Sequence, residues 1–192
     1  MSDKIIQSPE NQTFFLPVSV VVPIYNGEQD LPDFLACLGE QTYPRDLVEY
    51  LLVDNNSRDR TAELLEIAAK ASEKQGNSIT IRPLTQTQIQ SSYAARNTGI
   101  RAATGKIIAF TDADCRPKPD WLTTLIQPFI DNQVGVVAGE IQALLGTTIL
   151  EKYADSKDTL SQKHTINHSF CAYGQTANLA IRRCIFEKIG LF

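Results

Sequence analysis

The sequence lacks the cysteine patterns and long apolar runs that would define several protein classes directly. Its four cysteines include no C-x-x-C pair, so no common zinc site or disulfide framework is visible. No stretch approaches the roughly 20 apolar residues of a membrane span, and the first residues are too polar for a secretory signal. We therefore expect reduced thiols and a cytoplasmic location. A longer parent protein could associate with the cytoplasmic face of a membrane.

The sequence also lacks the usual phosphate-binding and hydrolase signatures. The first predicted strand is followed by PIYNGE at residues 23–28, where a dinucleotide-binding fold would carry G-x-G-x-x-G. Neither the G-x-x-x-x-G-K-[ST] of P-loop NTPases nor the G-x-S-x-G of α/β-hydrolases occurs. A nucleotidyltransferase would need a basic, Gly-rich loop at the same place. The net charge of −4 makes nucleic acid an improbable partner.

What the sequence does contain is typical of one globular domain. The 192 residues, 43% apolar and 21% charged, are enough to bury a sizeable core. Residues 1–16 are mostly polar and predict a flexible N-terminal arm, which leaves residues 17–192 as the domain.

Short apolar runs alternate with helical patterns along that domain. Strands are predicted over residues 18–22, 48–53, 78–84 and 106–110, with helices between them. This alternation predicts right-handed βαβ units, and so an α/β fold with a mainly parallel, twisted sheet covered by helices on both faces. Further along, we predict strands over 134–141 and 174–181 and a long one-sided helix with Ile149, Tyr153, Leu160 and His164 on one face.

Polar clusters follow three of the first four strands. They are residues 25–28, residues 54–57 and the triplet Asp112-Ala113-Asp114. Because the carboxyl ends of parallel strands share one edge, the clusters should line one crevice, where ligands of such folds bind. Two neighbouring carboxylates are costly to desolvate unless a cation balances them. A divalent metal that also holds substrate phosphates is one good reason for the arrangement.

Six segments in order resemble the successive motifs of the family-two glycosyltransferases, and the resemblance runs from about residue 18 to the end. The segments are 18–28 (VSVVVPIYNGE), 53–61 (VDNNSRDRT), 95–101 (ARNTGIR), 110–114 (FTDAD), 174–183 (GQTANLAIRR) and 186–192 (FEKIGLF). The resemblance implies a GT-A fold, a nucleoside-diphosphate sugar donor such as a UDP-sugar, inversion at the anomeric carbon, and Mn²⁺ or Mg²⁺. It also implies work on a carbohydrate, lipid or other hydroxyl acceptor, as in cell-envelope polysaccharide synthesis.

The resemblance assigns roles to the residues of the first two clusters. Pro23, Tyr25 and Glu28 would line the nucleoside pocket, and Asp54 would hydrogen-bond the base. The residues themselves leave other interpretations open. Tyr25 could be a half-buried aromatic residue at the sheet edge, and Asp54 a turn residue.

The resemblance also assigns roles around the acidic triplet. Arg96 would lie near the base or the phosphates, Asp112 and Ala113 would face the ribose or the sugar, and Asp114 would bind the metal together with Asp112. A structural ion pair is the open alternative for Arg96.

A second possible metal site lies near the end of the chain. His164, His168 and Cys171 are four and three residues apart, a spacing that could place three ligands on one helix face. The stretch is a poor helix and no fourth ligand is obvious, so we favour acceptor-side or surface roles for these residues.

The sequence departs from the family pattern at its end. After the block that matches residues 186–192, the family continues into an acidic pair that includes the usual catalytic base. We therefore assign the base to no residue of this chain. The expectation is a donor-binding part of a glycosyltransferase that transfers sugar poorly by itself, and the alternative is a non-catalytic nucleotide-sugar-binding module.

Overall fold

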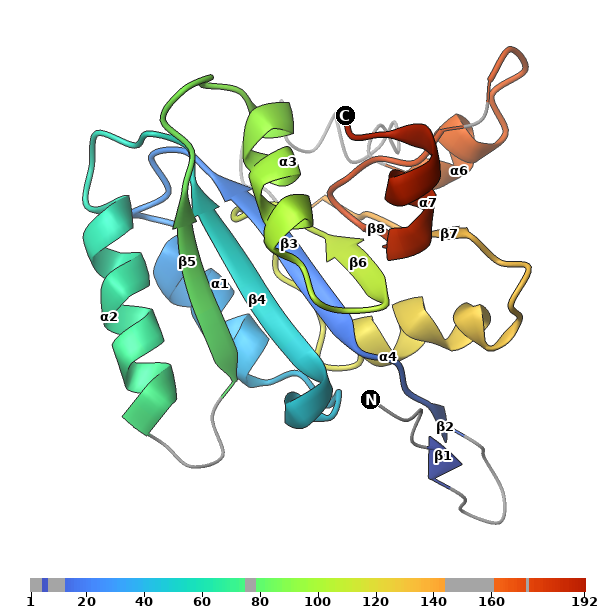
Figure 1. Cartoon of the computed structure of the whole chain (residues 1–192), viewed down its shortest axis with the longest axis horizontal. Coiled ribbons are helices and arrows are strands. Elements are labelled where there is room, and N and C mark those ends of the chain that lie inside the picture. Colours follow the sequence, from blue (N-terminus) through green and yellow to red (C-terminus); the bar gives the residue numbers. More distant parts are fainter. Residues whose placement is uncertain (1–4, 7–12, 75–78, 144–160, 172) are drawn as a thin grey trace.

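The computed structural model describes residues 5–6, 13–74, 79–143, 161–171 and 173–192. Six strands form one sheet in the order β5-β4-β3-β6-β8-β7, and two short strands pair separately (Figure 1). The strands are β1 (Ile5–Ile6), β2 (Thr13–Phe14), β3 (Val18–Ile24), β4 (Val48–Asp54), β5 (Thr80–Thr85), β6 (Ile107–Phe110), β7 (Val136–Ala138) and β8 (Leu179–Arg182). The helices are α1 (Leu31–Gly39), η1 (Arg45–Leu47), α2 (Thr61–Lys74), α3 (Ser92–Ala102), α4 (Trp121–Ile126), η2 (Gln127–Ile130), α6 (Gln162–Ile166) and α7 (Arg183–Ile189).

The four strands β5, β4, β3 and β6 are parallel, as the alternation of strands and helices predicts. The strand β3 runs two residues further than expected, because Pro23 stays in register opposite Val53. The fold class predicted from the sequence is confirmed, a mixed α/β fold with a mainly parallel sheet.

The far side of the sheet is antiparallel and shorter than predicted. The strand β8 pairs antiparallel with β6 and with β7. The strand predicted over 134–141 is confined to β7, because Asn178 packs where a side chain on Gly139 would project and its amide donates to the Glu140 carbonyl oxygen. The predicted helix over residues 149–160 lies outside the described residues, and α6 contains His164.

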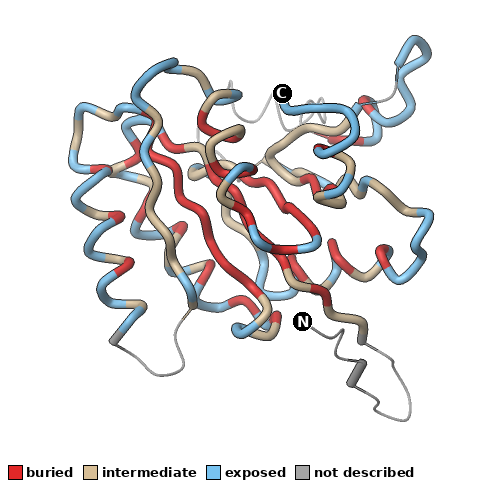
Figure 2. The backbone as a smooth tube through the Cα atoms, in the orientation of Figure 1, coloured by how far each residue is buried: buried red, intermediate tan, exposed pale blue. Residues whose placement is uncertain are grey.

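Both faces of the sheet are buried at β3 and β4, which explains why these two strands are mostly apolar. Val20 and Val22 belong to the cluster that α1, α2 and α4 cover, whereas Val21 faces the cluster under α3 and α7. Figure 2 shows the buried strands in the middle and the exposed helix surfaces around them. The predicted arm is not free throughout, because Leu16 is buried in the first cluster.

A buried polar network lies at the amino ends of these strands. The Glu49 carboxylate accepts hydrogen bonds from the Ser19 hydroxyl (2.6 Å) and from the Thr104 amide and hydroxyl (2.7 Å each), and it pairs with Arg82. Burial alone would raise the Glu49 pKa, but these bonds outweigh it and hold the pKa below its ordinary value.

Among the described helices, none has the length and apolar character needed to cross a bilayer.

Candidate functional site

The loops that follow β3 and β4 are joined by reciprocal hydrogen bonds between side chains and backbone. The Asn26 amide donates to the Ser57 hydroxyl (2.9 Å), and the Asn26 side-chain oxygen accepts from the Arg58 amide (2.9 Å). Asn26 adopts a left-handed backbone with φ of 50°, which asparagine tolerates better than most residues. These bonds bring the two predicted clusters together and leave the Tyr25 ring 48% exposed beside them.

Glu28 takes part in the same connection. Its carboxylate accepts from the Arg60 amide (3.0 Å), and its own amide donates to Asp59 (3.0 Å). Asp59 also accepts from the Thr61 amide (3.0 Å) at the start of α2. The structure therefore gives Glu28 a role in loop architecture, and its contact with a nucleoside stays a prediction, as does that of the half-buried Pro23.

Asp54 ends β4 and is almost fully buried. One of its carboxylate oxygens accepts from the Ser57 amide (3.0 Å), so the turn role that the sequence left open is present. Next to it, the Asn55 side-chain oxygen is buried without a hydrogen-bond partner. A buried acceptor without a partner is uncommon in folded proteins, and this one lies directly after the last residue of β4.

The acidic triplet follows β6, the neighbour of β3 on its other side. Asp112 is 34% exposed, and it forms an ion pair of 2.7 Å with Arg96, which α3 holds almost fully buried. Burial raises the Asp112 pKa, and the nearby Asp114 raises it further, although Arg96 opposes both effects. The ion pair left open for Arg96 is therefore present, and Arg96 also has a buried Nε without a partner.

Asp114 is exposed, and Ala113 beside it is half-buried. Within the part of the chain that the structure describes, the Asp114 carboxylate accepts only a long contact of 3.8 Å from the Cys115 thiol. Two carboxylates on one turn are oxygen ligands of the kind that Mn²⁺ and Mg²⁺ take together with substrate phosphates. The residues therefore fit such an ion, with Asp114 as the better placed ligand because Arg96 already engages Asp112.

No group of three or more His, Cys, Asp or Glu side chains gathers as a metal cage within the described ranges. His164, His168 and Cys171 are accordingly not brought together as a metal site. All three residues are exposed, in agreement with the surface roles that we favoured.

Arg116 connects the acidic turn to α1, a contact that sequence reasoning missed. Its guanidinium donates to the Cys115 carbonyl oxygen (3.0 Å) and to the carboxylates of Asp30 (3.2 Å) and Asp33 (3.4 Å). The arginine stands two residues after the acidic triplet, and this proximity is the signal that could have drawn attention to it. The residue fixes the turn that carries Asp114 against the start of α1.

Asn178 and Gln162 hold together the segments at the β8 end of the edge where the polar clusters lie. The Trp121 indole donates to the Asn178 side chain (2.9 Å), and the Gln162 amide donates to the Gly139 and Asn178 carbonyl oxygens (2.7 Å each). The exposed Glu140 lies on this side. These bonds join α4, α6 and β8 into one wall beside the acidic turn.

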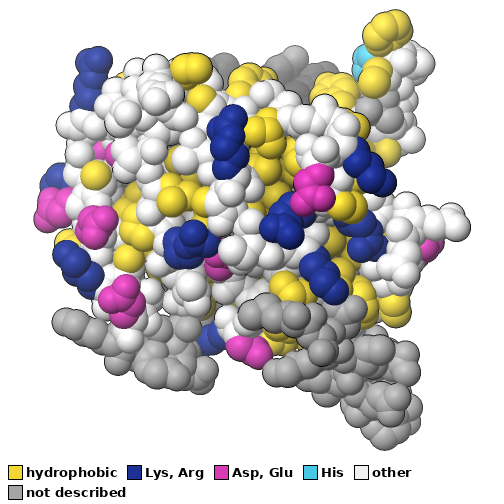
Figure 3. Space-filling view, in the orientation of Figure 1, with side chains coloured by type: hydrophobic (Ala, Val, Ile, Leu, Met, Phe, Trp, Pro, Cys, Tyr) yellow, Lys and Arg dark blue, Asp and Glu magenta, His cyan; other side chains and the backbone are white. Residues whose placement is uncertain are grey.

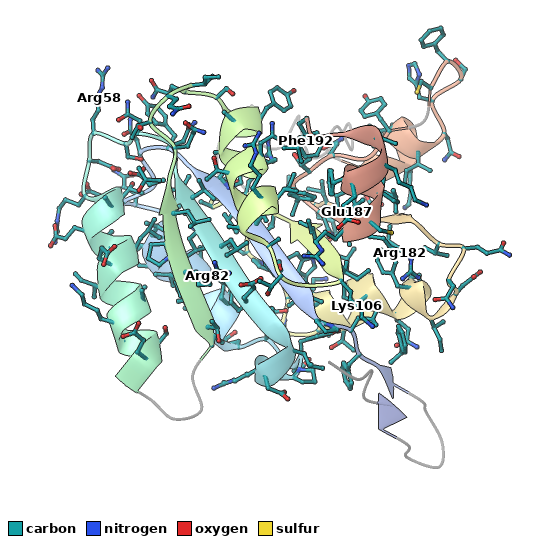
Figure 4. All side chains as sticks on the ribbon, viewed as in Figure 1. Arg58, Arg82, Lys106, Arg182, Glu187 and Phe192 are labelled. Atoms are coloured by element: carbon teal, nitrogen blue, oxygen red, sulfur yellow. The ribbon has the colours of Figure 1, made fainter. Side chains whose placement is uncertain are left out.

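The segment after α7 returns to α3 on the opposite face of the sheet. The Asn97 side chain exchanges two hydrogen bonds with the Phe192 backbone (2.8 and 3.1 Å), and the Phe192 ring packs against Phe110 and Phe186. Figure 4 labels Phe192 beside α3 and α7. Arg96 and Asn97 are neighbours on α3, so one helix holds both the acidic turn and the residues that follow α7.

Comparisons with known proteins agree with this architecture. The family model of glycosyl transferase family 2 matches residues 19–189. Glycosyltransferase AglE of Haloferax volcanii is 36% identical over 91% of this chain and 55% of its own length. An undecaprenyl-phosphate 4-deoxy-4-formamido-L-arabinose transferase of Pseudomonas aeruginosa is 36% identical over 57% of this chain and 31% of its own.

Solved structures resemble the chain at lower identity. The mannosyltransferase PcManGT of Pyrobaculum calidifontis, in complex with GDP-Man and Mn²⁺, has a TM-score of 0.72 at 24% identity, over 100% of this chain and 51% of its own. S. aureus TarS in complex with UDP-GlcNAc has a TM-score of 0.65 at 22% identity, over 89% of this chain and 46% of its own. These likenesses show the GT-A fold. The chain spans a third to about a half of the length of the curated relatives.

Proposed function

The chain belongs to glycosyl transferase family 2, and we propose that it binds a nucleoside-diphosphate sugar and transfers the sugar to an acceptor with inversion. The observation that carries the proposal is the convergence of Asp54, Asp112 and Asp114 on one edge of the sheet, with Arg96 paired to Asp112. Parallel sheets bind their ligands at this edge.

Different residues at this edge of the sheet would recognise different parts of the donor. Asp54 accepts hydrogen bonds from the base, and Tyr25 lies beside it with a ring face open to the nucleoside. Pro23 and Glu28 shape the loop that closes this pocket. Stacking on an aromatic face and a charged hydrogen bond to the base give both affinity and base selectivity.

The acidic turn would stabilise the negative charge of the nucleoside-diphosphate leaving group. Asp114, together with Asp112, would hold Mn²⁺ or Mg²⁺, which supplies Lewis-acid stabilisation of the diphosphate charge. Arg96 fixes Asp112 and adds positive charge at the same place, while Ala113, between the two carboxylates, would contact the sugar. Groups aimed in advance at developing charge lower the barrier without reorganising during the reaction.

The acceptor that we propose is lipid-linked. The Pseudomonas aeruginosa relatives are named as undecaprenyl-phosphate sugar transferases, and the wall formed by Trp121, Gln162 and Asn178 borders the acidic turn on the side left for an acceptor. An exposed phosphate or hydroxyl of a lipid carrier would reach the sugar from this side.

Calorimetry with UDP, GDP and ADP in the presence of Mn²⁺ tests the donor site. One nucleotide should bind most tightly, and Asp54→Ala should weaken it about tenfold or more, the cost of a charged hydrogen bond. The matched control is Asp120→Ala, because Asp120 is exposed and makes no side-chain cap bond to α4. Equal affinities for Asp54→Ala and the unchanged protein would remove Asp54 from the site.

A further inference from the structure

The loop that follows α6 presents an aromatic residue to solvent in an unusual way. Phe170 is 92% exposed, the largest fraction among the exposed large hydrophobic residues of the described chain. Ile166 and Tyr173 flank it and are 45% and 55% exposed. We call Ile166, Phe170 and Tyr173 the aromatic tip. Single exposed apolar residues are common, but a cluster on one projection indicates an interaction surface.

Hydrogen bonds hold the loop in the shape that exposes Phe170. The Tyr173 amide donates to the Thr165 carbonyl oxygen (3.2 Å) and closes the base of the loop. Thr165 is itself buried, so the base is anchored on the domain. At the outer end, the Phe170 and Cys171 amides both approach the His168 Nδ1 atom (3.4 and 3.5 Å). The folded loop thus directs the aromatic ring outwards.

Lys163 is the charged residue nearest to the aromatic tip along the chain, and its sign is opposite to that of the net charge of the whole chain. No Asp or Glu occurs between Asp158 and Glu187, although the chain has 22 acidic residues and a net charge of −4. Lys163 and both histidines of the protein, His164 and His168, lie in this stretch. The three residues are exposed. A lysine beside exposed aromatic and aliphatic side chains matches an anionic lipid headgroup layer with acyl chains beneath it.

The position of the loop suits contact with a surface. Figure 1 shows the segment after α6 projecting from the molecule on the side towards which the arrowheads of β3, β4 and β5 point. Figure 3 shows hydrophobic side chains and a histidine at the outer end of this projection. A bilayer touched by the projection would lie on the side of the molecule where the polar clusters emerge from the sheet.

We propose that the aromatic tip docks on the surface of an anionic lipid bilayer, with Phe170 inserted at the headgroup boundary and Lys163 near the anionic headgroups. Aromatic rings are favoured at this boundary, and a single inserted ring with few cations gives reversible binding. The proposal concerns a surface separate from the nucleotide site, so neither inference depends on the other.

Co-sedimentation of the 192-residue protein with vesicles tests the proposal. We expect binding to vesicles of phosphatidylglycerol and phosphatidylcholine, and much weaker binding to phosphatidylcholine alone. Phe170→Ser should weaken binding to the anionic vesicles about tenfold, and Lys163→Gln should weaken it less and reduce its salt dependence. The control is Ile67→Ser, because Ile67 is a 53% exposed apolar residue on α2.

Fluorescence gives a second measurement that does not depend on loss of binding. The single native tryptophan, Trp121, is buried, so Phe170→Trp adds an exposed reporter. Its emission should shift to the blue with anionic vesicles and be quenched by brominated lipids. The proposal would be overturned if the emission of Phe170→Trp did not change with vesicles, or if Phe170→Ser bound the vesicles as tightly as the unchanged protein. It would also be overturned if Phe170→Ser changed the oligomeric state of the protein in the absence of vesicles. Nucleotide binding measured without vesicles shows independently whether the donor site is intact.

Discussion

At the scale of single residues, the Arg96–Asp112 pair determines how the acidic turn is built. Arg96 is buried and delivers one guanidinium nitrogen to Asp112 at 2.7 Å. A buried arginine without its carboxylate is an uncompensated charge, which is far more costly than an exposed one. The ion pair is a structural role, and the role of both residues in the donor site stays a proposal that the sequence alone could not separate from it.

Replacement of Arg96 should reveal its structural role. Arg96→Met leaves the half-buried Asp112 without its partner, and we expect the free energy of unfolding to fall by roughly 1–3 kcal/mol. Urea denaturation measures this change. In the double variant Arg96→Met/Asp112→Asn, part of the loss should be recovered because the remaining group is neutral. Strictly additive losses would show that the two side chains do not interact.

Arg116 should act on the site through position rather than contact. Arg116→Met frees the acidic turn from Asp30 and Asp33, so nucleotide binding with Mn²⁺ should weaken about tenfold because ordering the turn then costs entropy. Binding without metal should change little, and Arg116→Lys should restore part of the loss. The control is Arg101→Met, at an exposed position in the last turn of α3. If the nucleotide affinities of Arg116→Met with and without Mn²⁺ fall by the same factor, the positioning role is wrong.

At the scale of elements, α3 is the helix on which the site depends. It is capped by the Ser91 hydroxyl, which accepts from the Ala94 amide (3.1 Å), and its small residues let it approach β3 closely. A methyl group on Gly99 would lie 2.4 Å from a Val21 methyl carbon. The closeness fixes where Arg96 and Asn97 emerge from the helix.

Gly99→Ala tests this packing. The added methyl group must displace α3 or Val21, so we expect the free energy of unfolding to fall by roughly 1–3 kcal/mol, measured by thermal or urea denaturation. Gly39→Ala is the matched control in α1, where nothing lies within 4 Å of the added carbon. This control should be neutral or slightly stabilising, by roughly 0.5–1 kcal/mol. Equal stabilities for the two variants would contradict the close approach.

The elements also show what the sequence could and could not predict. The strands β3, β4 and β6 were predictable because burial on both faces makes them mostly apolar. The antiparallel direction of β8 and the early end of β7 were not, because both depend on Asn178, Gly139 and Gln162 meeting from three segments. Likewise, the contact of Arg116 with α1 is set only by the folded chain.

At the scale of the whole molecule, the sheet carries charge networks at both ends of its strands. The acidic turn and its partners lie at the carboxyl ends, and the buried Glu49 network with Ser19, Thr104 and Arg82 lies at the amino ends. The first network has the exposed carboxylate of Asp114 and a buried Arg96 nitrogen without a partner, and the second is closed by protein groups. Ligand binding is therefore expected at one end and stability at the other.

The pH dependence of stability should report the Glu49 network. Because the folded pKa of Glu49 lies below the ordinary value of 4.5, its contribution is complete above that pH and is lost as the pH falls through the folded pKa. Glu49→Gln should therefore be less stable than the unchanged protein at pH 7, and the difference should shrink below pH 4.5. Urea denaturation at several pH values measures it. A difference independent of pH would contradict the assignment.

The central claim is that Asp114 holds a divalent ion that joins the protein to a nucleoside diphosphate. Calorimetry of the best-binding nucleotide with and without Mn²⁺, in the unchanged protein, Asp114→Ala and the control Asp120→Ala, tests it most directly. We predict that Mn²⁺ strengthens binding about tenfold or more in the unchanged protein and in Asp120→Ala, and that this gain disappears in Asp114→Ala. Binding that does not respond to Mn²⁺, or a gain that survives in Asp114→Ala, would contradict the claim.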